Sequence, residues 1–174
     1  MNFITQVTIS IVLYFFVRVL VKKPNSLFIA SFVSTISYIV MYLVLYQSIT
    51  LLPTLHFLVT GLSLIILFIS YYEIVLLERN VRKIKLGLFE NAESFPIERS
   101  YKLVFKILGL GLLFLSLALI SGFAIQSIFT NNLIIKSAFT IIAWFISLIT
   151  LIGTKSFTFP IKYARRGLFI SMWA

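Results

Sequence analysis

The chain contains a single histidine, His56, and this side chain is the one with clear metal-binding chemistry. Neutral imidazole is the commonest metal ligand among side chains, it binds haem iron, and it carries protons near neutral pH. The chain has no cysteine, which excludes disulfides, thiolate metal sites and thioether attachment of haem. A histidine at the end of an apolar helix is also often a simple interfacial polar residue, and that interpretation stays open.

The acidic residues do not complete a conventional site around His56. All five are glutamates, and we expect all of them at or beyond the cytoplasmic face of the membrane. The one that follows His56 most closely in sequence is Glu73, and a helix between the two would separate them by roughly 25 Å along its axis. We therefore expect neither a zinc hydrolase site nor a serine–histidine–carboxylate triad. The sequence predicts that the protein is not an enzyme.

Two further candidate residues follow in a later apolar run. Lys136 begins this run, and Trp144 lies eight residues further on, on the same predicted helix face. The lysine can extend its ammonium group to the membrane interface while its methylene stem lines the bundle. A simple interfacial anchor is an equally good interpretation of Lys136.

Helices must position these residues, and the sequence supplies five apolar runs of membrane-spanning length. Sixty per cent of the 174 residues are hydrophobic and the mean hydropathy is +1.08, whereas soluble domains are about 45–50% apolar. A helix of about 20 residues crosses the hydrocarbon core, and five runs meet this test: about 3–21, 27–47, 56–77, 104–125 and 133–153. A sixth run, 167–174, predicts only a short helical stub, as if the chain were truncated there. The first run lacks the features of a cleaved signal peptide, so we expect a retained helix.

The charged residues predict the topology of these helices. Basic clusters follow the first, third and fifth runs, whereas the connectors 47–55 and 126–132 carry no charge. Short basic loops remain in the cytoplasm, so segment 78–103, a helical extension followed by a loop to Pro96, is predicted to be cytoplasmic. The N-terminus and His56 are then outside. The fold class is all-α: one polytopic transmembrane helix bundle, residues 1–174, with five spanning helices and a stub.

The net charge of +10 does not indicate nucleic acid binding. The basic residues lie next to the membrane and are interleaved with glutamates. They are explained by the topology and by attraction to anionic lipids. Membrane lipids are therefore the predicted partners of this charge.

Hydroxyl and aromatic residues recur every three or four positions in three of the runs, which places them on one face of each helix. We expect these stripes to face one another and to form interhelical hydrogen bonds, worth about 0.6 kcal/mol each. Ala118 and Gly122 predict a close approach by the third or the fifth helix. The stripes are Ser31, Thr35, Tyr38, Tyr42 and Tyr46; His56, Thr60, Ser63 and Ser70; and Ser137, Thr140, Trp144 and Ser147.

From His56 onward, about two-thirds of the chain carries an ordered series of residues that resembles a known family. The series is His56 at a helix start, a charged helix end at 78–85, Phe95-Pro96-Ile97-Glu98, Gly111 with a Leu-rich run to Ser121-Gly122, Lys136 and Trp144, Gly153, and Arg165-Arg166-Gly167. In order and spacing it is similar to the cytochrome c assembly protein family of haem-handling membrane proteins, in particular its small inner-membrane branch.

The resemblance implies a membrane accessory protein for haem handling and cytochrome c assembly at the outer face of the bacterial inner (plasma) membrane. It implies haem b as the cofactor and His56 as an axial ligand of the haem iron. Lys136 would bind a propionate and Trp144 would line an apolar pocket. Other cytochrome c maturation proteins, or proteins of a membrane complex, are the implied partners.

Two alternatives from other classes stay open. One is a scaffold or interaction subunit of another membrane complex that binds no cofactor. The other is a small-solute transporter, which we rank last because the predicted spans contain neither a central charge nor a proline, features that many transporters have at the membrane midplane.

Overall fold

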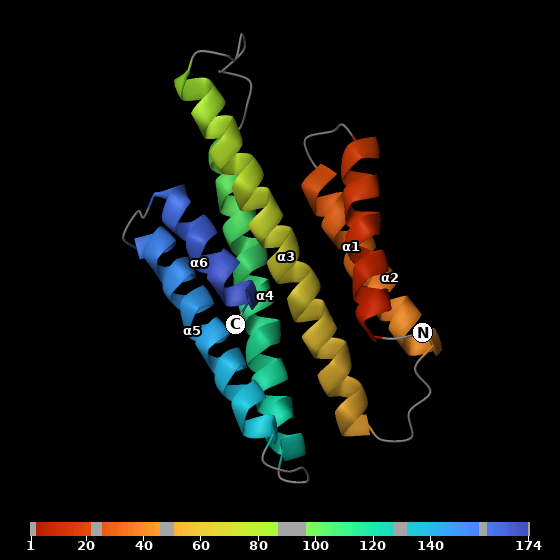
Figure 1. The fold of residues 1–174 in the computed structure, drawn as a ribbon. Helices are drawn as coiled ribbons and strands as arrows, with labels where there is room; N and C mark the ends of the chain where they lie inside the picture. Colours follow the sequence, from red (N-terminus) through yellow and green to blue (C-terminus); the bar gives the residue numbers. More distant parts are fainter. Residues whose placement is uncertain are drawn as a thin grey trace.

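A computed structural model describes residues 3–21, 26–45, 51–86, 97–126, 132–156 and 160–173 of the chain. These residues form helices that pack side by side in an all-α fold (Figure 1). The helices are α1 (Phe3–Leu20), α2 (Ser26–Leu45), α3 (Leu51–Lys85), α4 (Ile97–Gln126), α5 (Asn132–Ser156) and α6 (Ile161–Trp173).

The helix bounds correct the sequence prediction in two places. Helix α3 begins at Leu51, so the second half of the predicted connector 47–55 is already helical. Pro53 permits this because it lies in the first turn, where its missing N–H has no helical partner to lose. Helix α6 begins at Ile161, directly after Pro160, and so the predicted stub is longer by almost two turns.

Among the described residues, four helices are long and apolar enough to cross a membrane: α1, α2, α3 and α4. This agrees with the prediction of a membrane protein. In α5 the apolar part with described side chains is Ala138–Gly153, shorter than the usual span, so the fifth span stays a prediction. The described part of α6 has 13 residues, about 20 Å of helix, which is less than the roughly 30 Å of the hydrocarbon core.

Helix α3 is the central element of the fold. In Figure 1 it lies between the α1–α2 pair on one side and α4, α5 and α6 on the other. Its buried residues cover most of its circumference from Gly61 to Leu77, the pattern of a helix enclosed by neighbours. It contributes Ile65 and Ile69 to a core shared with α1 and α2, and Leu67 and Ile74 to a second core shared with α2, α4 and α6.

Helices α3 and α4 pack antiparallel, and glycine residues of α4 set their register. A Cβ atom added at Gly111 would lie 3.1 Å from the Cγ2 of Ile66 and 3.3 Å from the Cδ2 of Leu67. One added at Gly122 would lie 3.3 Å from the Cε1 of His56. The predicted close approach at Gly122 is therefore confirmed, and the neighbour is α3.

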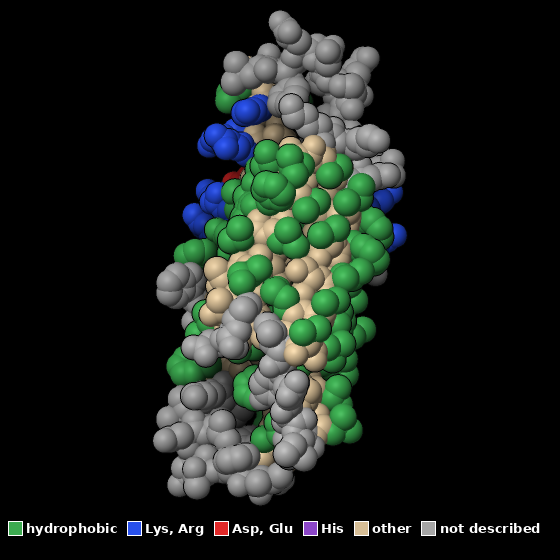
Figure 2. Space-filling model, turned by 90° about the vertical axis from the view of Figure 1, so that its right-hand side faces the viewer, with side chains coloured by type: hydrophobic (Ala, Val, Ile, Leu, Met, Phe, Trp, Pro, Cys, Tyr) green, Lys and Arg blue, Asp and Glu red, His purple; other side chains and the backbone are tan. Residues whose placement is uncertain are grey.

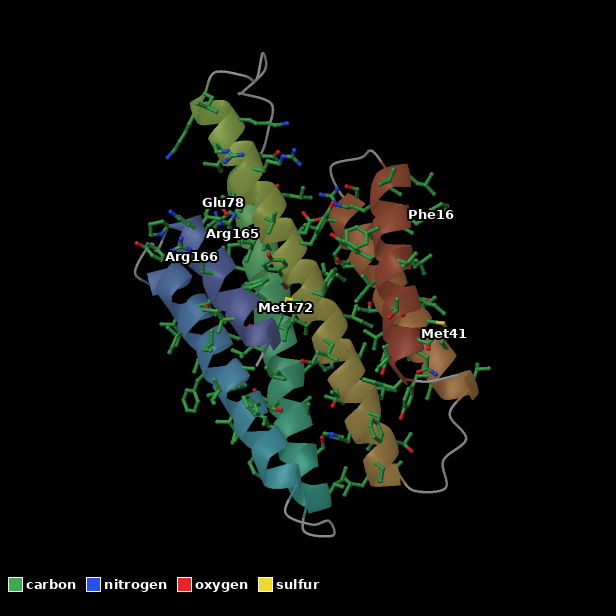
Figure 3. The ribbon with its side chains drawn as sticks, in the orientation of Figure 1. Phe16, Met41, Glu78, Arg165, Arg166 and Met172 are labelled. Carbon is green, nitrogen blue, oxygen red and sulfur yellow. The ribbon has the colours of Figure 1, made fainter. Side chains whose placement is uncertain are left out.

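Apolar side chains cover the outer surface between the two ends of the bundle. Large hydrophobic residues such as Phe16 and Val40 are exposed, and the labelled Phe16 and Met41 point outward from α1 and α2 (Figure 3). Lysine and arginine residues instead gather toward one end, at the top of Figure 2. We call this the basic end, and the opposite end, where α3 begins, the His56 end.

The packing of Tyr38 on Gly61 leads to the first prediction. A Cβ atom added at Gly61 would overlap the ring of Tyr38, which is fully buried. Gly61→Ala should lower the free energy of unfolding by about 1–3 kcal/mol, as overpacking usually does. The measurement is the thermal unfolding midpoint in mild detergent.

Gly109→Ala is the matched control, because the nearest atom to its added Cβ would be a Leu151 Cδ2 at 3.9 Å, an ordinary contact. This variant should keep or raise the midpoint, since alanine favours helix. Equal midpoints for the two variants would contradict the packing of α2 on α3.

Candidate functional site

The structure places His56 in the second turn of α3, against the end of α4. Its Nδ1 lies 2.9 Å from the Oγ of Ser121, and its Cε1 faces Gly122. The ring is half-buried and makes an edge contact with Phe57. Glycine at position 122 leaves room for the imidazole, so the α3–α4 contact fixes the position of the ring.

The hydrogen bonds of Ser121 determine which nitrogen of His56 is available. Its hydroxyl donates to the carbonyl oxygen of Ala118 at 3.1 Å, one turn back in α4. A hydroxyl has one proton, so Ser121 engaged in this way can only accept from His56. We therefore expect the proton on Nδ1 and the lone pair on Nε2, as in metal-ligating histidines whose other nitrogen is held by a second residue.

Trp144 does not join His56 in one pocket. Its Nε1 donates to the Oγ of Ser116 at 2.7 Å, which joins α5 to α4. Ser116 and Ser121 are five residues apart, or about 140° around α4 at 100° per residue. His56 and Trp144 thus contact different faces of α4, from α3 and from α5. Lys136 lies in the first turns of α5, and its side chain lies outside the described residues.

The expectation that three polar stripes face one another is only partly right. Tyr38 and Tyr42 of α2 do face α3, where they donate to the carbonyl oxygens of Phe57 at 3.0 Å and Thr54 at 2.8 Å. Helix α5 packs instead on α4 and α6, and so its stripe lies away from α2. Ser31 and Thr35 bond to carbonyls of their own helix, and Tyr46 lies outside the described residues.

Sequence reasoning missed a buried cluster of charged and polar groups between α1, α2 and α3. Arg18 binds Glu73 through two nitrogens, with Nε 2.8 Å from Oε1 and Nη2 3.2 Å from Oε2. The Glu73 side chain is 6% exposed and that of Arg18 27%. The hydroxyl of Tyr14 also donates to Glu73, and Arg18 donates to Ser26 of α2.

This cluster ends a polar seam that runs along the inner face of α1. The buried residues of α1 are Gln6, Ser10 and Tyr14, spaced four apart, and Arg18 continues the series. Ser34 of α2 donates to the Ser10 carbonyl oxygen at 2.7 Å. The spacing of these residues was present in the sequence. An arginine ending one apolar run and a glutamate inside another were a second available signal that the helices pair there.

Glu73 also corrects the expectation that every glutamate lies at or beyond the membrane face. The carboxylate is enclosed by α1 and α3, one long turn inside the start of the charged extension at Glu78. It lies near the basic end rather than at the bundle centre. The transporter interpretation therefore keeps its last rank, although one of its missing features, a buried ionisable group, is present.

Among the described residues no group of three or more histidine, cysteine, aspartate or glutamate side chains is placed to hold a metal ion. A metal bound by His56 would thus need ligands from a cofactor or from another molecule. No protein-family model, curated protein or solved structure matches the chain. The family resemblance therefore stays a prediction that depends on the residues quoted above.

The buried ion pair leads to the second prediction. Glu73→Leu leaves Arg18 without its carboxylate and Tyr14 without its acceptor, which should reduce stability by about 3–5 kcal/mol. The double variant Arg18→Leu/Glu73→Leu should recover most of this loss, because apolar residues in place of both charges remove the cost of burying them. Thermal unfolding in detergent measures both effects.

Glu78→Leu is the control, since this carboxylate is partly exposed on the same helix and faces Arg165. Its effect should stay below about 1 kcal/mol, as for other exposed ion pairs. A Glu73→Leu variant as stable as Glu78→Leu would contradict the buried pair.

Proposed function

We propose that the protein is a non-enzymatic accessory of haem handling in cytochrome c assembly, and that His56 is an axial ligand of haem iron. The observation that carries the proposal is the Nδ1 contact of His56 with Ser121, which leaves Nε2 as the ligand nitrogen. The family resemblance supplies the identity of the metal group, since imidazole alone is compatible with several metals.

In this proposal His56 would hold the iron of haem b. The ring is half-buried, so it is both oriented and accessible. Haem would need only one or two ligands from the protein, which suits a chain whose described residues offer one histidine and no carboxylate cluster. Haem bound at this position would supply redox and ligand-exchange chemistry. Lys136 at the start of α5 is the proposed propionate partner, whereas Trp144 is engaged by Ser116 and serves the packing of α5.

The location follows from the distribution of charge. The extension of α3 carries Arg79, Arg82, Lys83 and Lys85, so we propose that the basic end is cytoplasmic and that the His56 end faces outward. The resemblance implies that the membrane is the inner (plasma) membrane of a bacterium, in which proteins that assemble cytochromes c have this orientation. His56 is then on the side where those cytochromes receive haem.

The third prediction tests this orientation. An alkaline phosphatase reporter, active only outside the cytoplasm, should be silent when fused after Asn91 and active when fused after Asn131. The reason is that Asn91 follows the basic extension of α3 and Asn131 precedes α5. A green fluorescent protein reporter at the same two sites should show the opposite pattern. An active phosphatase at Asn91 would place His56 in the cytoplasm and end the proposed role.

The fourth prediction tests haem ligation. Purified protein titrated with haemin should develop a Soret band, and His56→Ala and His56→Gln should lose it because both lack the imidazole. Ser121→Ala removes the same interhelical hydrogen bond but keeps the imidazole, so it should keep the band with affinity about 10-fold weaker, a usual effect of removing an outer partner of a ligand.

These variants separate ligation from packing. A band that survives in both His56 variants would show that another residue binds the iron. No band in the wild type would contradict the haem proposal and favour the scaffold interpretation, in which His56 only joins α3 to α4.

A further inference from the structure

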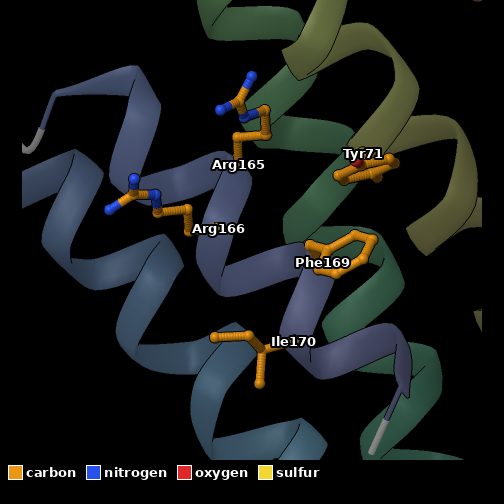
Figure 4. A pocket seen from close by; sticks show the side chains of 5 residues that line it. All are labelled: Tyr71, Arg165, Arg166, Phe169 and Ile170. Carbon is orange, nitrogen blue, oxygen red and sulfur yellow. The ribbon is translucent and has the colours of Figure 1, made fainter.

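A pocket of about 360 Å³ opens on the surface near the basic end, beside α6 and α3. Its lining combines two guanidinium groups with aromatic and aliphatic side chains: Tyr71, Arg165, Arg166, Phe169 and Ile170 (Figure 4). In α6 the arginines lie one turn closer to the start of the helix than Phe169 and Ile170. Cationic groups therefore border one end of the pocket and apolar groups the other.

Among the described residues, one carboxylate lies against one of the two arginines of the cationic end. Arg165 directs its Nε to the Oε2 of Glu78 at 3.2 Å (Figure 3). Arg166 is exposed and has no carboxylate partner among the described residues. The described stretches 78–86 and 160–173 contain one acidic residue, Glu78, and seven basic residues: Arg79, Arg82, Lys83, Lys85, Lys162, Arg165 and Arg166.

The apolar end of the pocket is open to the surroundings of the bundle. Phe169 is 49% exposed and Ile170 is 54% exposed, and the ring of Phe169 packs beside Tyr71 with centroids 6.0 Å apart. Both residues belong to α6 and lie on its exposed side. A ligand that suits this pocket has an anionic head and an apolar tail.

We propose that this pocket binds an anionic phospholipid. The phosphate lies between Arg165 and Arg166, and an acyl chain follows Phe169 and Ile170 toward the interior of the membrane. Basic pockets between helices at the cytoplasmic face recognise lipid headgroups in this way. Arginine suits the role because its planar guanidinium donates two hydrogen bonds to a phosphate at once.

The experiment measures ligand-induced stabilisation of the purified protein in mild detergent. Thermal unfolding is followed while phosphatidylglycerol, phosphatidylcholine or inorganic phosphate is added. Phosphatidylglycerol should raise the unfolding temperature in a saturable way, because a ligand that binds the folded state stabilises it. The other two should have little effect, since one lacks net charge and the other lacks an acyl chain.

Variants of the lining residues assign the effect to the pocket. Arg165→Gln/Arg166→Gln should raise the half-maximal phosphatidylglycerol concentration about 30-fold, because each basic residue near an anionic lipid contributes roughly fivefold. Glu78→Gln should lower that concentration, since it removes the carboxylate that competes for Arg165. If Arg165→Gln/Arg166→Gln does not fold, the phosphatidylglycerol titration of Glu78→Gln tests the proposal.

Lys106→Gln is the matched control. Lys106 is exposed on α4, and the α3–α4 register places it opposite residue 72, at the depth of Tyr71. The variant Lys106→Gln removes one positive charge at the depth of Tyr71 without changing a residue of the pocket, so lipid binding should be unchanged. The proposal is overturned if phosphatidylcholine or inorganic phosphate stabilises the wild type equally. It is also overturned if the double variant binds like the wild type, if Glu78→Gln does not bind more tightly, or if Lys106→Gln weakens binding as much as the double variant.

Discussion

One constraint shapes the bundle: a polar group on a helix in hydrocarbon is costly without a partner inside the protein, because there is no water to bind it. Glu73 shows its strength, since this carboxylate accepts from Arg18 and Tyr14 and is thereby shared between α1 and α3. Breaking such a pair costs about 3–5 kcal/mol, several times the roughly 0.6 kcal/mol of an ordinary interhelical hydrogen bond. The ion pair therefore joins α1 to α3, and the hydrogen bonds of Tyr38 and Tyr42 join α2 to α3 directly.

The other helices are joined by weaker bonds of the same kind. His56 joins α3 to α4 through Ser121, and Trp144 joins α5 to α4 through Ser116. Small residues let the helices approach closely where these bonds form, as Gly122 does beside His56. Packing in lipid relies on such close contacts, because expulsion of water contributes nothing there. The contact with Ser121 also orients the ring of His56, because holding Nδ1 fixes the direction in which Nε2 points.

The sequence predicted the helices well because hydropathy and length are local properties. The first and fourth helices begin where the apolar runs and Pro96 indicate, and α3 continues into its charged extension as expected. The start of α3 was placed too late because Pro53 was taken as part of a connector, although a proline fits the first turn of a helix. Four helices are long and apolar enough to span a membrane among the described residues. The described part of α5 is too short, so the fifth span stays a prediction.

The site was less predictable, because spacing gives the face of a helix but not its neighbour. The polar stripe of α5 was expected to face the stripes of α2 and α3, but α5 packs on α4 and α6. Trp144 was therefore grouped with His56, although α4 separates the two residues. Glu73 was assigned to the membrane face because its position in the run is near the charged end. The spacing of Arg18 and Glu73 in their runs hinted at a pair, but only the packing of α1 on α3 shows that the carboxylate is enclosed.

The two ends of the bundle have different chemistry. The His56 end offers one oriented imidazole among apolar residues, and the basic end offers guanidinium groups beside an open apolar surface. α3 contributes to both, through His56 at its start and Tyr71 and Glu78 farther along.

The most direct test of the account is the protonation state of the imidazole, which the single histidine makes accessible. In protein labelled with 15N-histidine, the NMR spectrum above the pKa of the imidazole reports which ring nitrogen carries the proton. The account predicts a proton on Nδ1 and a bare Nε2 in the wild type, and loss of this preference in Ser121→Ala. A proton on Nε2 in the wild type would contradict it, because that nitrogen would then be unavailable to iron.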